Sequence, residues 1–142
     1  MAEYSLDIIG VQNSGDDSTL VETHCSCTFT QRDSKLYIRY TEDGISRLLT
    51  VSGQRVTLRT PGAPGSVLEF EQGLETHGEY HTPYGVIGLR ILTRSLDIYD
   101  DTKFDDTDAG STWRLNMDYE LFADGSKLSD NTLQLTVTAV SA

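Results

Sequence analysis

The stretch TWRLNMDYEL, residues 112–121, decides the fold class, because polar and apolar residues alternate along its whole length. Successive side chains of a β-strand point to opposite faces, so such alternation predicts a strand with one buried and one solvated face. After an Asp124-Gly125 turn the alternation resumes in LQLTVTA, residues 133–139. The two stretches together predict a β-hairpin.

The same period of two continues upstream. Ile87, Leu89, Ile91 and Thr93 alternate with glycine, arginine and leucine, and an acidic segment at 100–110 separates this strand from the one through Trp113. The composition also favours strands, since threonine, which is common in strands, occurs seventeen times, and lysine, which is depleted in strands, occurs only three times. Shorter strands are predicted at Tyr4–Val11, Leu20–Thr30, Lys35–Thr41, Arg47–Ser52, Arg55–Thr60, Val67–Glu71 and Glu79–Thr82.

Short connections favour antiparallel neighbours throughout. Glycine-containing pairs such as Asp43-Gly44 and Ser52-Gly53 supply the positive φ of tight turns. About ten such strands leave exposed edges unless the sheet closes. We therefore expect an all-β fold, an antiparallel up-and-down β-barrel of about eight to ten strands, with a two-sheet sandwich as the alternative. A length of 142 residues predicts one domain spanning 1–142.

Charge and hydropathy exclude several classes of function. The net charge is −11, which disfavours binding to nucleic acids and to anionic membranes. No apolar run approaches the roughly 18 residues of a membrane-spanning helix. Glu3 and Asp7 stand where a signal peptide has basic residues, and no apolar region follows. The expected location is cytoplasmic.

Short motifs along the chain, among them Phe70-Glu71-Gln72-Gly73 and Tyr80-His81-Thr82-Pro83-Tyr84-Gly85, resemble the YwiB-like family of uncharacterised small bacterial proteins. The resemblance spans nearly the whole chain. Its residues are Phe70-Glu71-Gln72-Gly73, Tyr80-His81-Thr82-Pro83-Tyr84-Gly85, Leu89–Thr93 with Leu96, Leu115–Tyr119 with the hairpin to Val137, Tyr37–Glu42, and Leu58-Arg59.

This resemblance implies a calycin-like barrel, similar in shape to lipocalins and fatty-acid-binding proteins, in cytoplasmic bacterial proteins with no assigned activity. It supplies no catalytic residues. The acidic segment 100–110 and the stretch Pro61–Gly65 depart from the family pattern.

The two cysteines, Cys25 and Cys27, are interpreted as reduced thiols that act as small hydrophobic side chains. Two residues apart in a strand, their Cα atoms would lie about 6.6 Å apart, at the far limit for a disulfide. No C-x-x-C spacing and no adjacent basic residue marks a redox pair.

Two segments contain the residue types that bind metal ions. His77, Glu79 and His81 would share one strand face, but the outer pair would lie about 13 Å apart, too far for one zinc ion. The acidic segment 97–108 lacks the residue order of an EF-hand, so we interpret it as a solvated hairpin loop, with weak Ca²⁺ binding as the alternative. We therefore expect no metal site.

Catalytic and cofactor signatures are missing from the sequence. There is no G-x-S-x-G nucleophile motif, no G-x-G-x-x-G and no P-loop. The chain is therefore not expected to be an enzyme or to hold a cofactor.

Two functional hypotheses remain. In the first, the barrel encloses a small apolar or amphipathic ligand, and polar strand residues that point inward hold it; the candidates are Arg59, Tyr80, Thr82 and Arg90. In the second, an outer face that includes Tyr37, Tyr99 or Phe104 binds a protein partner or a second copy as a homodimer. A polar-lined cavity above roughly 300 Å³ would favour the first, and a filled barrel with a large apolar outer patch the second.

Overall fold

The computed structural model describes residues 3–60, 66–82, 84–101 and 111–141, with the side chains of these residues except 80–82 and 141. In this part of the chain ten strands form. They are β1 (Glu3–Ser14), β2 (Asp17–Arg32), β3 (Lys35–Glu42), β4 (Ile45–Ser52), β5 (Arg55–Thr60), β6 (Ser66–Glu71), β7 (Glu75–Thr82), β8 (Gly85–Asp100), β9 (Thr112–Ala123) and β10 (Ser126–Ser141).

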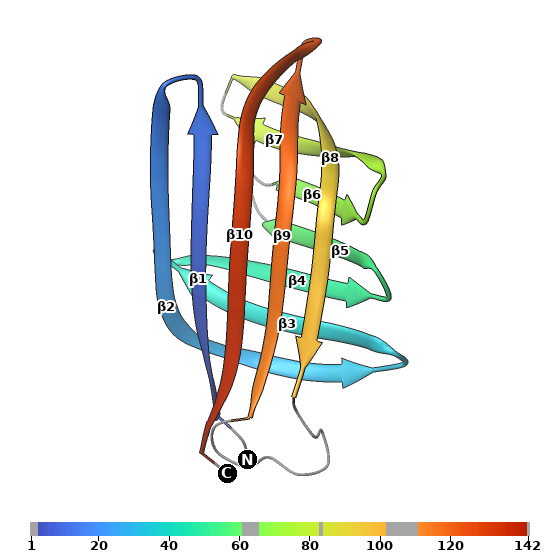
Figure 1. The fold of residues 1–142 in the computed structure, drawn as a ribbon. Coiled ribbons are helices and arrows are strands. Elements are labelled where there is room, and N and C mark those ends of the chain that lie inside the picture. Colours follow the sequence, from blue (N-terminus) through green and yellow to red (C-terminus); the bar gives the residue numbers. More distant parts are fainter. Residues whose placement is uncertain (1–2, 61–65, 83, 102–110, 142) are drawn as a thin grey trace.

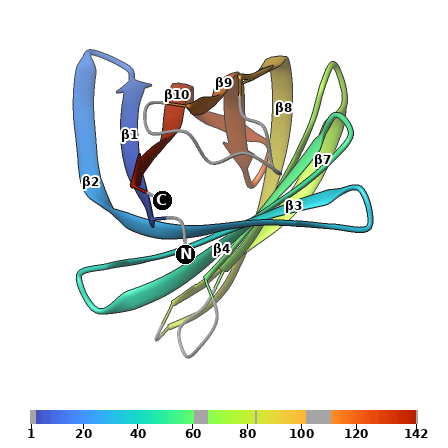
Figure 2. The same ribbon diagram turned by 90° about the horizontal axis from the view of Figure 1, so that it is seen from below.

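Each strand pairs antiparallel with its neighbours in the sequence, and β1 pairs with β10 to close the barrel. The predicted all-β, up-and-down antiparallel barrel is confirmed, and the sandwich alternative is wrong. Every predicted strand is present, although β2, β7 and β8 are longer than their sequence patterns indicate. Figures 1 and 2 show the two chain ends together at one end of the barrel.

The two long strands β2 and β8 turn the sheet from one direction to the other. β2 pairs with β1 along its first part and with β3 along Cys27–Arg32. β8 pairs with β7 over Gly85–Leu92 and with β9 over Arg90–Asp100. As a result β1, β10 and β9 run lengthwise in Figure 1, while β3 to β7 run across them.

A β-bulge at Arg94 changes which residues of β8 face inward. The pairing register with β9 shifts between Thr93 and Ser95, and beyond the shift Leu96 is buried while Asp97 is exposed. The Arg94 guanidinium lies outside, 2.6 Å from Asp118 Oδ1. The bulge thus reverses the alternation that holds from Leu89 to Thr93, as bulges do by inserting one residue in one strand.

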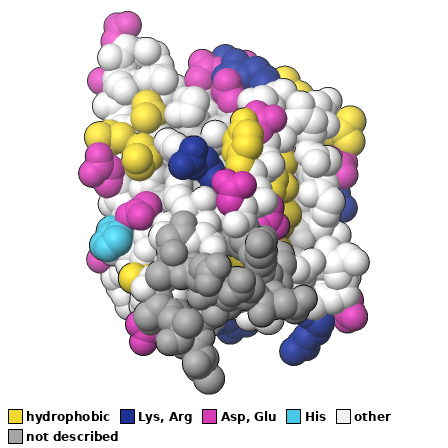
Figure 3. Space-filling view, turned by 60° about the horizontal axis from the view of Figure 1, so that its bottom comes forward, with side chains coloured by type: hydrophobic (Ala, Val, Ile, Leu, Met, Phe, Trp, Pro, Cys, Tyr) yellow, Lys and Arg dark blue, Asp and Glu magenta, His cyan; other side chains and the backbone are white. Residues whose placement is uncertain are grey.

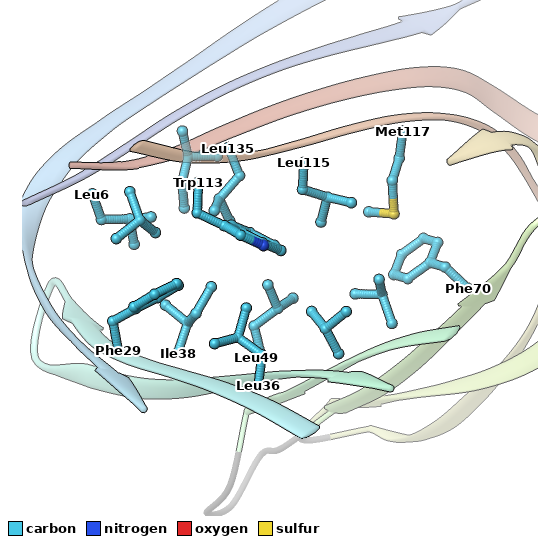
Figure 4. Packing of buried hydrophobic residues seen from close by; sticks show 14 of the residues in the cluster. Leu6, Phe29, Leu36, Ile38, Leu49, Phe70, Trp113, Leu115, Met117 and Leu135 are labelled. Atoms are coloured by element: carbon cyan, nitrogen blue, oxygen red, sulfur yellow. The ribbon is translucent and has the colours of Figure 1, made fainter. Parts of the chain in front are cut away.

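The core fills most of the space between the two walls of the barrel. Figure 4 shows Trp113, Leu115, Met117 and Leu135 on one wall facing a row of apolar side chains on the other. Trp113 is 2% exposed and its ring lies 6.1 Å from that of Phe29. The facing row consists of Phe29, Leu36, Ile38 and Leu49, with Phe70 at one end.

Thr93→Val is expected to stabilise the protein by about 1 kcal/mol, because it removes a buried hydroxyl that lacks a partner. Thr93 is fully buried, and its Oγ1 has no hydrogen-bond partner among the described residues. Its backbone, which valine keeps, accepts from Gly73 N at 2.9 Å and donates to Leu74 O at 3.3 Å. Chemical denaturation with an unchanged m-value checks this gain, and Thr93→Ser, which keeps the hydroxyl, should show none.

Candidate functional site

A partly open cavity of about 190 Å³ adjoins the core, and its lining includes the core residues Ile8, Tyr40, Leu49 and Leu135. Its walls come from β1, β2, β3, β4, β5, β9 and β10 and are mainly aliphatic. The aliphatic lining residues are Ile8, Val11, Val21, Leu49, Leu58, Leu133 and Leu135. An apolar cavity of about 150 Å³ can hold benzene, so this one has room for a benzene-sized body with a small polar group.

One side of the cavity is polar and carries both signs of charge. Arg47 Nη1 lies 3.6 Å from Glu42 Oε1, and the Thr23 hydroxyl donates a hydrogen bond to Glu42 Oε2. Arg47 Nε is buried and has no acceptor among the described residues. Arg47, a residue of the cavity wall, therefore has one buried N–H donor that makes no hydrogen bond within the described residues.

Strand alternation explains why these two charged residues lie inside. Glu42 continues the inward face of Leu36, Ile38 and Tyr40 in β3, and Arg47 shares the face of Leu49 in β4. The two strands meet at the Asp43-Gly44 turn, where both residues have positive φ as a two-residue hairpin requires. The inward positions of Glu42 and Arg47 can be predicted from strand alternation in the sequence. The sequence does not show that a cavity remains beside these two side chains.

Two tyrosines at the cavity, Tyr40 and Tyr119, have phenol groups with raised pKa values. Burial raises the pKa of Tyr40, and the Arg47 guanidinium, which hydrogen-bonds the phenol, partly opposes this increase. Burial also raises the pKa of Tyr119. Both phenols are therefore neutral hydrogen-bonding groups at physiological pH.

Cys25 and Cys27 are free thiols that point into the barrel next to Tyr4. Burial raises the pKa of Cys27 to about 12, with a smaller contribution from Cys25. Burial, followed by the carboxylates of Glu42 and Asp7, also raises the pKa of Cys25. A raised pKa leaves little thiolate, so neither cysteine has the character of a nucleophile.

The barrel is expected to lose stability in alkali. The Cys27 thiol has its ordinary pKa of 9.0 in the unfolded chain and about 12 in the fold, so its contribution is complete below pH 9 and is lost as the pH rises toward 12. Tyr40 and Tyr119 act in the same direction from their ordinary value of 10.0. Melting temperatures measured between about pH 8 and 11 should fall less steeply for Cys27→Ala than for the wild type. Parallel curves would show that the thiol makes no such contribution.

Of the four residues predicted to hold a ligand, the structure describes the side chains of Arg59 and Arg90. Arg59 is exposed on β5, since its neighbour Leu58 lines the cavity and alternation sends Arg59 outward. Arg90 is also exposed; its Nη1 lies 2.9 Å from Glu75 Oε1 and its guanidinium lies 5.0 Å from the Phe122 ring centre. The side chains of Tyr80 and Thr82 lie outside the described ones. A ligand-binding role for these four stays a prediction, and neither arginine lines the cavity.

The segments considered for metal binding are only partly described. His77 and Glu79 are exposed, and the His81 side chain lies outside the described ones. Most of the acidic segment, including 102–110, is likewise outside, so weak Ca²⁺ binding there stays a prediction. Within the described ranges no three His, Cys, Asp or Glu side chains gather in a way that could hold a metal ion.

The outer surface carries its hydrophobic side chains in small groups on the face that Figure 3 shows, with charged side chains between them. Tyr99 is 53% exposed, Tyr37 is half-buried, and Phe104 lies outside the described residues. Partner binding or self-association through these residues stays a prediction. In residues 3–60, 66–82, 84–101 and 111–141 no helix has the length and apolar character to cross a membrane.

Comparison with known proteins shows the family and the fold. The crystal structure of the ywiB protein from Bacillus subtilis is similar, with a TM-score of 0.82 and 17% identity over 99% of this chain and 93% of that chain. At this identity the likeness shows the fold. No curated protein matches the chain. A model of the domain of unknown function DUF1934 matches residues 6–135, and the resemblance to YwiB-like proteins is thereby confirmed: the chain belongs to the DUF1934 family.

Proposed function

We propose that this barrel binds a small, neutral, amphipathic ligand in the cavity beside Arg47. The supporting observation is that Arg47 lines the cavity and has a buried Nε with no acceptor among the described residues. A buried donor without a partner costs about 1–3 kcal/mol, and a ligand that brings an acceptor recovers that cost. The aliphatic walls then take the apolar body of the ligand.

The volume sets the size of the ligand. About 190 Å³ lies below the roughly 300 Å³ at which sites for drug-sized molecules begin. A long acyl chain therefore does not fit in this cavity. The suitable class is a compact molecule of about ten non-hydrogen atoms or fewer.

The charges at the wall favour a neutral polar group over an anion. Glu42 lies 3.6 Å from the Arg47 guanidinium and already balances its charge. A ligand carboxylate placed at Arg47 Nε would meet the Glu42 carboxylate as well, and like charges in a partly desolvated site repel. A carbonyl, amide or ether oxygen avoids this repulsion.

Binding of three matched probes tests the proposal. Benzamide has a neutral acceptor, benzoate is its anionic counterpart, and toluene has a similar body without an acceptor. We expect benzamide to bind with a roughly millimolar dissociation constant, and toluene and benzoate to bind at least about fivefold more weakly. Chemical-shift titration of the isotopically labelled protein measures all three. Equal affinity for the three probes, or shifts remote from the cavity, would contradict the proposal.

Three variants locate the site. Arg47→Met should weaken benzamide binding about tenfold and leave toluene binding unchanged, since only benzamide uses the donor. Gly10 lines the cavity, and a Cβ added there would lie 3.7 Å from Leu133 Cδ1 without a clash. Gly10→Val therefore adds volume inside the cavity and should weaken the binding of all probes. Gly88→Val is the matched control, because an added Cβ there has nothing within 4 Å.

A further inference from the structure

Half of β2 is an unpaired strand edge. β2 pairs with β1 over Asp17–Cys27, but with β3 only over Cys27–Arg32. Among the described residues no strand pairs with the other side of 17–26, and Figure 1 shows this half beside β1 at the border of the barrel. Its outward backbone N–H and C=O groups are therefore open to another strand.

This edge lacks several of the usual protections against strand addition, and the charged side chains that it does carry are mostly acidic. Residues 17–26 contain no proline and no lysine, and the β1–β2 pairing has no bulge there. Leu20 and Val21 are 59% and 51% exposed, one on each face of the strand. A regular edge with exposed apolar side chains is the geometry that accepts an added β-strand.

The edge and the cavity adjoin. Val21 and Thr23 of β2 belong to the cavity wall. A strand laid along this edge would send every second side chain toward the cavity side, because side chains alternate in a strand. An apolar residue at those positions would have an apolar surface to contact.

Charge identifies the kind of strand that fits. Asp16, Asp17 and Glu22 lie on or next to the edge, and Glu22, Glu42 and Asp43 surround one shallow hollow beside it. A second copy of the chain fits less well than a basic peptide, since two such edges side by side would bring Asp17 and Glu22 of both copies together. Each copy also carries a net charge of −11.

We propose that the free edge of β2 at residues 17–26 binds an extended basic peptide in which lysine or arginine alternates with apolar residues. The peptide backbone pairs with β2, its apolar side chains face the cavity side, and its cations face the acidic side chains. This binding does not depend on the small ligand and survives if no small ligand binds.

A titration with a defined peptide tests the inference. The probe is an acetylated and amidated six-residue peptide of alternating lysine and valine. We expect shifts in 17–26 and slower amide hydrogen exchange at alternate residues of that segment, because their outward N–H groups gain acceptors. A peptide of alternating lysine and glycine carries the same charge with weak strand propensity and should bind at least about fivefold more weakly.

A matched pair of charge variants completes the test. Glu22→Lys should weaken binding of the lysine-valine peptide about tenfold, whereas Asp97→Lys, the same reversal at an exposed strand position on β8, should change it less than about twofold. Three outcomes overturn the inference: equal binding of both peptides, equal effects of both variants, or unchanged hydrogen exchange in 17–26. A dimer in sedimentation experiments that protects 17–26 without peptide would assign the edge to a second copy and would also overturn it.

Discussion

Trp113→Ala is expected to lower the free energy of unfolding by about 4 kcal/mol, the largest loss among the substitutions considered. Trp113 is 2% exposed and lies between the two walls of the core, with its ring 6.1 Å from that of Phe29. Phe29 in turn lies 5.2 Å from the Tyr4 ring. Alanine leaves a cavity where three strands meet, and a stiff closed barrel cannot collapse to fill it.

Urea denaturation followed by circular dichroism measures this loss, since the variant lacks the only tryptophan of the chain. Tyr99→Ala is the control: Tyr99 is 53% exposed on β8, so its truncation should cost less than about 1 kcal/mol. A loss below about 2 kcal/mol for Trp113→Ala would mean that this side chain does not join the two walls.

Gly78→Ala is expected to destabilise the barrel by about 2–3 kcal/mol through overpacking. A Cβ at this position would lie 2.9 Å from the backbone oxygen of Val67 and 2.9 Å from Leu68 Cδ2. The leucine side chain can rotate away, but the Val67 carbonyl belongs to β6. In the described residues β6 and β7 are paired only at Ser66 with Tyr80 and at Val67 with Glu79, the fewest residue pairs between any two neighbouring strands. The added methyl group would therefore push apart the two strands that are held together least.

Gly88→Ala separates this clash from the general effect of replacing a strand glycine. Gly88 is exposed on the adjacent strand and an added Cβ has nothing within 4 Å. Alanine there should be neutral or slightly stabilising, because glycine weakens a strand interior. Equal unfolding free energies for the two variants would show that β6 and β7 have room to separate at Gly78.

The period of two was enough to predict antiparallel strands with one buried face, while closure into a barrel rather than a two-sheet sandwich was inferred from the need to remove exposed edges. The stretch 112–121 has its odd-numbered residues inside, as its pattern indicates. The bulge at Arg94 could not be predicted in this way, since Leu92, Arg94 and Leu96 read as one continuous face in the sequence. Only pairing with β9 reveals that one residue is extra.

The candidate site was predictable in part. Alternation places Glu42 and Arg47 on the inward faces of their strands, whereas Arg59 and Arg90, the two arginines predicted to hold a ligand, are exposed. The cavity itself depends on how completely side chains from seven strands fill the lumen, and that is a property of packing rather than of pattern. The free edge of β2 depends on where β2 leaves β1 for β3, which also requires the pairing.

The Nε–Hε resonance of Arg47 tests the central claim most directly, because this N–H is the donor that lacks an acceptor. Its signal is followed in the labelled protein during titration with benzamide and, separately, with toluene. The account predicts a downfield shift that saturates with benzamide and little change with toluene. An Arg47 signal that stays fixed while benzamide shifts other residues would show that the ligand binds elsewhere and would contradict the account.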